Sequence, residues 1–213
     1  MWNHALHTKT AERKLGTLQR KALIGITGAY RSTSTAALQV LAGIPPLDLE
    51  LKWMAAKEDA KNLPVGFRAD TLILATTKLL DTWQSRWTAS EKGRWTHECF
   101  PDIRNRIKLP IALGHEIAQF LTGHGNFQSK LAELGLRPTP HCSRGNGNED
   151  VRHVLYDCVI HEVHRASLEL AANREGFLWP TEIRNLVSRK ATYEALVKFA
   201  KVAAYLERPQ AAN

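Results

Sequence analysis

Apolar side chains recur every three to four residues along most of this chain, which is the spacing of one face of an α-helix. In residues 10–28, Leu15, Leu18 and Ala22 share such a face, and Gly28 is placed to end the helix. The same spacing predicts a short helix that is capped by Ser34 or Thr35 and ended by Gly43. Further helices are predicted at residues 47–61, 69–88, 113–122, 126–134, 159–175, 181–189 and 191–206. We find no strand alternation and no internal repeat, so the expected fold class is mostly α, an irregular multi-helix region.

Two stretches interrupt the helical pattern. Residues 89–112 and 136–148 are broken by Gly and Pro, so both are expected to be loops. The helix predicted before the first loop carries Trp83 and Trp87 on its apolar stripe. Tryptophans at helical spacing on an apolar face are usually core residues, so we favour core packing over base stacking for this pair.

Composition limits the class of protein. Of the 213 residues, 44% are hydrophobic and 23% are charged, which is typical of a globular protein with one or two cored domains. No apolar run reaches the length that spans a membrane, and the first residues lack a signal-peptide pattern. Three cysteines are too few for a disulfide framework, which favours a reducing, intracellular compartment.

The chain is basic, with a net charge of +8 and a pI of about 9.6. This excess fits a polyanionic partner such as RNA or DNA, and it equally fits a basic surface with no such partner. The cations of the first predicted loop are Arg94, Arg104, Arg106 and Lys108. Phosphate binding requires clustered cations in no particular order, whereas the alternative for these residues is a solvated loop.

Cysteine and histidine gather in one short segment. His153 and Cys158 form an H-x4-C step, which is the closing half of a zinc knuckle, and Cys142 stands in its opening half. Zinc takes four tetrahedral ligands from thiolate sulfur and imidazole nitrogen, and closely spaced ligands limit the loss of chain entropy. Arg144 occupies the place where a second cysteine would fit, and a guanidinium cannot coordinate a cation. We therefore expect a small degenerate zinc-knuckle-like loop that binds zinc weakly.

Other residues near the knuckle could complete the ligand set. His161 lies three residues beyond Cys158 and would give the pattern C-x10-H-x4-C-x2-H, while water is the alternative. Asp150 is a weaker candidate, because carboxylates are less common in structural zinc sites. Cys99 is distant and is expected to be a buried apolar residue. The domains that follow from this pattern are a helical region at 1–135, the knuckle-like segment at 136–160 and C-terminal helices at 161–213.

Several collinear motifs resemble one family. They are residues 18–23 (LQRKAL), 29–34 (AYRSTS), 41–46 (LAGIPP), 93–97 (GRWTH), 119–125 (QFLTGHG) and 149–155 (EDVRHVL). They resemble the region that follows the polymerase in the Pol polyprotein of insect non-LTR retrotransposons, most closely the type-one elements that insert into ribosomal DNA. The resemblance covers about residues 15–158, which is most of the chain.

The resemblance implies a place and a role for this chain. Polyproteins of the family carry an endonuclease, a central reverse transcriptase and a C-terminal region with the pattern Cys-x-Cys, His, Cys. Cys142, His153 and Cys158 match three of those positions, and Arg144 replaces the second cysteine. The implied role is binding template RNA or target DNA during target-primed reverse transcription, in the nucleus. The implied partners include the upstream polymerase and endonuclease domains, and only that polymerase would need Mg²⁺.

Catalytic motifs are absent from the sequence itself. A reverse transcriptase needs paired aspartates to hold two metal ions, and no Asp-Asp pair occurs here. No Walker loop, GxSxG or HExxH motif occurs either. The sequence thus predicts a nucleic-acid-binding fragment of a larger enzyme, with no catalytic centre of its own. Two alternatives stay open: a helical protein-interaction or structural domain, and a decayed copy of the element without activity.

Overall fold

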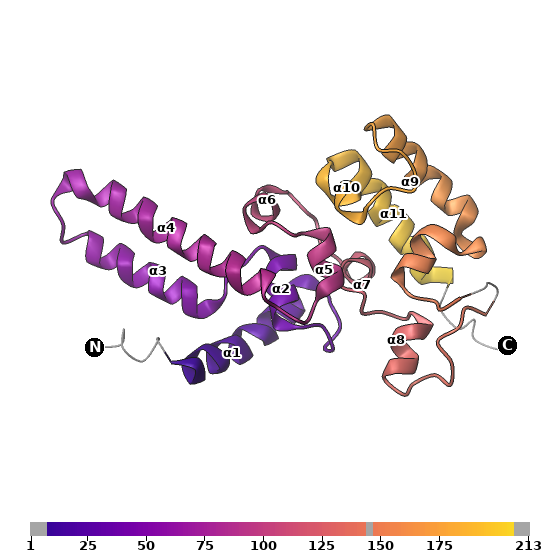
Figure 1. The fold of residues 1–213 in the computed structure, drawn as a ribbon, viewed down its shortest axis with the longest axis horizontal. Helices are drawn as coiled ribbons and strands as arrows, with labels where there is room; N and C mark the ends of the chain where they lie inside the picture. Colours follow the sequence, from indigo (N-terminus) through magenta and orange to yellow (C-terminus); the bar gives the residue numbers. More distant parts are fainter. Residues whose placement is uncertain (1–7, 144–146, 207–213) are drawn as a thin grey trace. The chain divides into compact units, whose positions relative to one another are not determined.

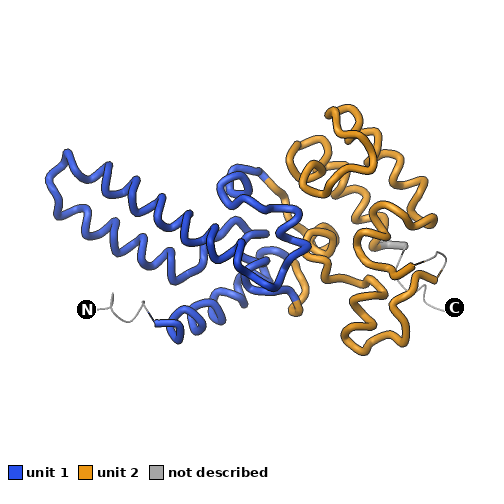
Figure 2. The backbone as a smooth tube through the Cα atoms, viewed as in Figure 1, with its two compact units in different colours: residues 1–27, 33–110 blue, residues 28–32, 111–213 orange. Residues whose placement is uncertain are grey.

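The computed structural model describes residues 8–143 and 147–206. These residues form helices, turns and loops, and their one β-type pairing is an isolated antiparallel bridge between His141 and Asn148. The chain divides into two compact units (Figure 2), which we call unit 1 (residues 1–27 and 33–110) and unit 2 (residues 28–32 and 111–213). The mostly α, multi-helix fold predicted from the sequence is confirmed.

Unit 1 begins with long helices and ends with short ones (Figure 1). Its elements are α1 (Lys9–Thr27), α2 (Thr35–Ala42), α3 (Leu47–Ala60), α4 (Val65–Thr88), α5 (Arg94–Cys99) and α6 (Ile103–Lys108). Helices α3 and α4 pack against each other along their length as a hairpin, and α1 packs on α2 and α3. Trp83 and Trp87 are among the largest fully buried side chains, which confirms that this tryptophan pair belongs to the core.

Local signals explain where these helices begin and end. Of the two candidate caps of α2, Ser34 and Thr35, the structure selects Ser34, whose hydroxyl accepts a hydrogen bond from the backbone N–H of Ala37. Gly43 ends the same helix in the left-handed conformation. Helix α4 starts at Val65, four residues before the predicted start, directly after Pro64. Proline fixes the backbone before the first turn, and the apolar periodicity of residues 69–88 does not extend back to it.

The expected loop at residues 89–112 is partly wrong, because it contains α5 and α6. Each of these helices has six residues, which is too short for apolar periodicity to reveal. A capping signal was present for α6, since the Asp102 carboxylate accepts from the backbone N–H of Asn105 at 2.6 Å. Ile103 at its start is fully buried and holds the short helix to the core of unit 1.

Unit 2 is built from shorter elements around one long helix (Figure 1). They are α7 (His115–Thr122), α8 (Gln128–Glu133), a π-helix η2 (His153–Asp157), a 3₁₀ turn η3 (Val159–His161), α9 (Glu162–Arg174), α10 (Ile183–Ser188) and α11 (Lys190–Leu206). Helix α11 packs against α7, α9 and α10, and its face of Leu196, Phe199, Ala200 and Ala203 is buried. The predicted helices at 113–122, 126–134 and 191–206 are confirmed within two residues. The π-helix was not predicted.

A short early segment, residues 28–32, belongs to unit 2. The carbonyl oxygen of Gly28 lies 2.8 Å from Nδ1 of His115, and Ser32 Oγ lies 2.8 Å from Nδ1 of His124. A Cβ on Gly28 would meet the backbone of His115 at 3.1 Å, and its φ is +67°, so glycine is required there. Tyr30 donates from its hydroxyl to the side-chain oxygen of Asn126. Two of the motifs that carry the resemblance therefore meet in one place.

The domain limits expected at residues 135 and 160 both fall inside unit 2. The structure brings residues 136–160 and the helices after them into one compact unit, because the π-helix and α9 pack together. Within the described part of the chain, no helix combines the length and the apolar character needed to cross a bilayer.

Candidate functional site

The first part of the Cys–His segment is a closed loop. The backbone N–H of Cys142 donates to the Gly147 carbonyl at 3.1 Å, and that of Glu149 donates to the Pro140 carbonyl at 2.9 Å. These two bonds flank the bridge between His141 and Asn148 and bring the ends of the loop together. Closure of the loop places Cys142 beside the helical segment that follows it in the chain.

The π-helix supplies the other two side chains. Asp150 caps the start of this helical segment, since its carboxylate accepts a hydrogen bond from the backbone N–H of His153 at 2.8 Å. The N–H of Cys158 donates to the carbonyl of His153 at 2.7 Å, which is the five-residue step of a π-helix. The H-x4-C spacing is therefore one wide turn, and single π-turns of this kind are frequent at functional sites.

A buried arginine holds the end of this turn. Arg165, on α9, donates from Nε to the Leu155 carbonyl and from Nη2 to the Cys158 carbonyl, both at 2.8 Å. A helix end leaves carbonyl groups without partners, and the guanidinium satisfies them inside the core. Sequence reasoning missed Arg165, because nothing in its neighbourhood marks it as buried.

The three side chains meet in a compact group. The ligand atoms of Cys142, His153 and Cys158 all lie within 4.8 Å of one another, and the two sulfurs are 3.9 Å apart. All three residues are buried, and neither cysteine is in a disulfide. Nε2 of His153 is buried and has no hydrogen-bond partner among the described residues. A buried nitrogen left in this way is costly unless something binds it, and a metal ion would do so. The group could hold a metal ion.

Electrostatics favour the thiol form of Cys158 when no metal is bound. Burial raises the pKa of this thiol, and the neighbouring Cys142 and the buried carboxylate of Glu149 raise it further. A hydrogen bond from the backbone of Ile160 acts in the opposite direction but does not cancel these effects. A bound cation would reverse the balance, because it stabilises the thiolate that coordinates it.

The other residues considered as metal ligands are not among the three of this compact group. His161 is buried, and its ring lies edge-on to Phe199 with 6.0 Å between the centroids. Among the described residues, the compact group of ligand atoms does not include it. Asp150 uses a carboxylate oxygen to cap the turn at His153. Arg144 lies outside the described residues.

The cations proposed for phosphate contact differ in how far they are exposed to solvent. Arg106 is buried, donates to the carbonyls of Leu41 and Leu109, and lies over the ring of Phe100. It is thus a structural residue of unit 1, and its burial leaves it no exposed group for a phosphate. Charge alone could not reveal this, because sequence does not report burial.

The remaining cations of α5 and α6 lie at the surface or near it. Arg94 is exposed and donates to the carbonyl of Ser90 at 3.1 Å. Arg104 is 39% exposed at its side chain and is paired with Asp81 at 2.8 Å. Lys108 is exposed at the end of α6. Surface pairs of this kind are weak, so Arg104 can exchange its partner for a phosphate at little cost.

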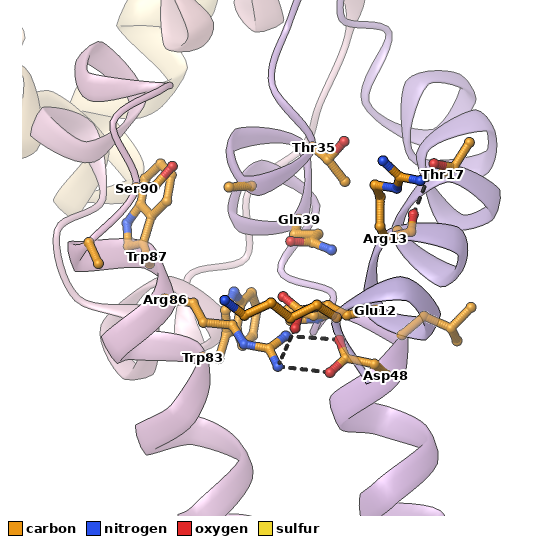
Figure 3. A pocket seen from close by; sticks show the side chains of 16 residues that line it. Glu12, Arg13, Thr17, Thr35, Gln39, Asp48, Trp83, Arg86, Trp87 and Ser90 are labelled. Atoms are coloured by element: carbon orange, nitrogen blue, oxygen red, sulfur yellow. Dashed lines mark hydrogen bonds and ion pairs between the residues drawn. The ribbon is translucent and has the colours of Figure 1, made fainter. Parts of the chain in front are cut away.

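Unit 1 also contains a pocket that the sequence did not indicate (Figure 3). It has a volume of about 670 Å³ and lies among α1, α2, the start of α3 and the end of α4. On its wall, Arg86 forms a two-pronged ion pair with the buried Asp48, at 2.9 and 2.8 Å. These two residues are 38 positions apart, so no local pattern could have paired them.

Comparisons with known proteins identify relatives of one kind. The chain is 34% identical over 177 residues to the "Retrovirus-related Pol polyprotein from type-1 retrotransposable element R1" of Bradysia coprophila, a match that covers 76% of this chain and 18% of the relative. It is 32% identical over 195 residues to the "Putative 115 kDa protein in type-1 retrotransposable element R1DM" of Drosophila melanogaster, covering 84% and 19%. A Pol polyprotein of element "R1 4" from Nasonia vitripennis is 34% identical over 206 residues, covering 90% and 52%.

No family model matches the chain, and no solved structure matches it. The chain spans from about a fifth to about half of the length of these relatives. Each match nonetheless covers at least three quarters of the chain itself, so the similarity includes both units. The chain belongs to the Pol polyproteins of R1-type retrotransposons and corresponds to their C-terminal part.

Proposed function

We propose that this chain is the nucleic-acid-binding C-terminal region of an R1-type Pol polyprotein and that its Cys–His group holds zinc. The observation that carries the proposal is the compact group of Cys142, His153 and Cys158, with the buried Nε2 of His153. Two thiolates and an imidazole match the ligand preference of zinc more closely than that of magnesium or calcium. In a polyprotein with a polymerase, a zinc site and a basic helical unit in one chain suit RNA or DNA as partner, and the nucleus as location.

The fourth zinc ligand is His161 or water. Movement of the 3₁₀ turn that carries His161 would be needed to bring its ring into the group, because that ring now packs on Phe199. Replacement of His161 by alanine distinguishes these two alternatives for the fourth ligand. Loss of zinc identifies His161 as the ligand, and unchanged zinc affinity identifies water. We further expect Arg144→Cys to tighten zinc binding, because it adds a thiolate two residues after Cys142.

The phosphate-binding residues of the proposal are Arg94, Arg104 and Lys108 in unit 1, together with Arg144, which lies outside the described residues. The test is a fluorescence titration of a labelled single-stranded RNA with the chain at several salt concentrations. Each phosphate contact contributes about 0.7 to the slope of log affinity against log salt. Arg94→Gln combined with Arg104→Gln is expected to weaken binding and to flatten that slope, whereas Lys190→Gln, which removes an 85%-exposed lysine of unit 2, is the matched control.

A protein-binding role is the second candidate, favoured by the hairpin of α3 and α4. Its outer part exposes large apolar side chains, among them Val65, Phe67, Ile73 and Leu74, each at least 64% exposed. Exposed apolar side chains gathered on one element are typical of interaction surfaces. The salt titration distinguishes the candidates, because a chain that binds proteins only would show no salt-dependent affinity for RNA or DNA.

A further inference from the structure

The pocket of unit 1 is large enough for a small ligand. Its volume of about 670 Å³ lies within the range of about 300–1,000 Å³ that is typical of ligand sites. Figure 3 shows Arg86 and Trp83 on one side and Glu12, Arg13 and Thr17 of α1 on the other. All of its lining residues belong to unit 1, so the pocket is a property of one compact unit.

Arg86 provides a flat, fixed surface inside this pocket. Both of its terminal nitrogens bond to Asp48, and Glu12 lies 3.4 Å from one of them, which fixes the plane of the guanidinium. Burial opposes the charge of Arg86, but the bonds and charges of the two carboxylates outweigh it and raise its pKa. The side chain remains 30% exposed. Because its charge is offset by two carboxylates, it suits stacking of a planar group better than binding a phosphate.

Two further cations stand on α1 where it borders the pocket. Lys9 and Arg13 line the pocket, are exposed and lie one helical turn apart. Neither forms an ion pair with any residue that the structure describes. The pocket thus combines a flat, charge-compensated surface with exposed cations beside it. A nucleotide has the same two parts, a planar base and a charged phosphate.

A glycine keeps the α1 side of the pocket open. Gly16 lies in the interior of α1 and lines the pocket, and a Cβ built on it would meet no atom within 4 Å. Glycine inside a helix costs about 0.5–1 kcal/mol relative to alanine, and internal packing does not require it here. Gly25 is equally unhindered in the same helix but does not line the pocket, so it offers a matched control position.

We propose that this pocket takes one unpaired base of a single-stranded RNA or DNA. The base stacks on the Arg86 plane, while the flanking phosphates contact Lys9 and Arg13. Every base has a stackable face, so such a site has little sequence preference. The inference rests on the proposed function, because it adds a contact with a base to the phosphate contacts proposed for Arg94, Arg104 and Lys108.

The test compares Gly16→Leu with Gly25→Leu in the full chain. The probes are fluorescent ten-nucleotide strands of uridine RNA, of thymidine DNA and of an abasic sugar–phosphate backbone. The unchanged chain is expected to bind the two strands with bases about tenfold more tightly than the abasic strand, which is within the range measured for stacking of one base. Gly16→Leu places an apolar side chain in the pocket and is expected to abolish that preference without changing the salt slope, because no charge is removed. Gly25→Leu retains the preference.

Further outcomes complete the test. The strand that loses more affinity in Gly16→Leu than in Gly25→Leu, whether the uridine RNA or the thymidine DNA, is the one that occupies the pocket. Lys9→Gln combined with Arg13→Gln is expected to flatten the salt slope for all three strands, by about 0.7 for each phosphate that the variant no longer binds. If Gly16→Leu, shown by circular dichroism to be folded, keeps the preference for bases, the pocket assignment is wrong and the proposed function stands. If the unchanged chain binds none of the strands, both are wrong.

Discussion

Unit 1 buries its largest side chains on long helices, whereas unit 2 arranges shorter segments around buried polar groups. The core of unit 1 contains Trp83 and Trp87, and its partly buried ion pair between Arg86 and Asp48 joins α3 to α4. Unit 2 instead buries Cys142, His153 and Cys158 in a loop and a π-helix. Apolar burial stabilises unit 1 without any ligand, but the polar group of unit 2 is costly unless a metal ion satisfies it. We therefore expect a metal ion bound at this group to stabilise unit 2 and to leave unit 1 unaffected.

Both units contain a buried arginine that stabilises the end of a helical segment. Arg106 in unit 1 and Arg165 in unit 2 are buried arginines that donate to backbone carbonyls at the end of a helix. Arg106 reaches Leu41 near the end of α2, and Arg165 reaches Cys158 after the π-helix. Each arginine therefore stabilises its unit, but only Arg165 also positions a candidate metal ligand.

The largest expected effect is that of Trp83→Ala in unit 1. Truncation of a fully buried tryptophan typically lowers the free energy of unfolding by about 3–5 kcal/mol. Urea unfolding followed by circular dichroism measures the loss, and zinc affinity measured in the folded protein is expected to stay unchanged. A parallel loss of zinc affinity would contradict the separation of the two units.

Arg165→Met and Arg106→Met form the next pair. Each removes charged hydrogen bonds from buried carbonyls, so each is expected to lower the free energy of unfolding by about 3 kcal/mol. Arg165→Met alone is expected to weaken zinc binding, by about 10–100-fold, as loss of a group that orients a ligand usually does. Competition with a chromogenic chelator measures this. Equal zinc affinity in the two variants would show that Arg165 does not position a zinc ligand.

Ser34→Ala and Asp150→Ala are a smaller matched pair, because both side chains accept from backbone N–H groups where a helical segment starts. Each change is expected to cost about 1 kcal/mol of stability, which urea unfolding measures. Asp150→Ala is also expected to weaken zinc binding, since its carboxylate positions the backbone of His153. If Asp150→Ala leaves zinc affinity unchanged and costs less stability than Ser34→Ala, Asp150 does not position His153 for zinc.

The smallest expected effect is the loss of stability that protonation of His97 in unit 1 causes at acidic pH. Burial lowers the pKa of His97 from its ordinary value of 6.5, and Arg94 lowers it further, while Glu98 partly opposes this. His97 therefore binds a proton more readily in the unfolded chain than in the folded one. The stability that its neutral ring contributes is complete above about pH 6.5, the pKa of the unfolded state, and is lost as the pH falls through the lower pKa of the folded state. His97→Phe keeps an aromatic ring beside Trp87 and is expected to flatten the dependence of unfolding free energy on pH below 6.5. An unchanged pH profile would assign the acid sensitivity to other groups.

Long elements and local signals were predictable from the sequence. The helices of residues 47–61 and 191–206 follow from apolar spacing, and residue type limits the cap of α2 to Ser34 or Thr35. The ligand trio follows from the chemistry of Cys and His, because zinc ligands are rare residue types at short spacings.

Features that depend on tertiary contacts were not predictable. The six-residue helices α5 and α6 are too short to show a period. The burial of Arg106 depends on Leu41, which is 65 positions away in the sequence. His161 is adjacent to the knuckle in sequence, but the 3₁₀ turn directs its ring towards Phe199. Sequence distance alone could not place that ring.

Zinc binding is the most direct test of the central claim that unit 2 is organised around a metal site. The measurement is competition with a chromogenic chelator, performed on the unchanged chain, on Cys158→Ser and on Cys99→Ser, a buried cysteine of unit 1 that serves as control. We predict one zinc for each chain, retained by Cys99→Ser and lost by Cys158→Ser, with a lower unfolding temperature for the variant that loses it. No zinc on the unchanged chain, or undiminished affinity in Cys158→Ser, would contradict the claim.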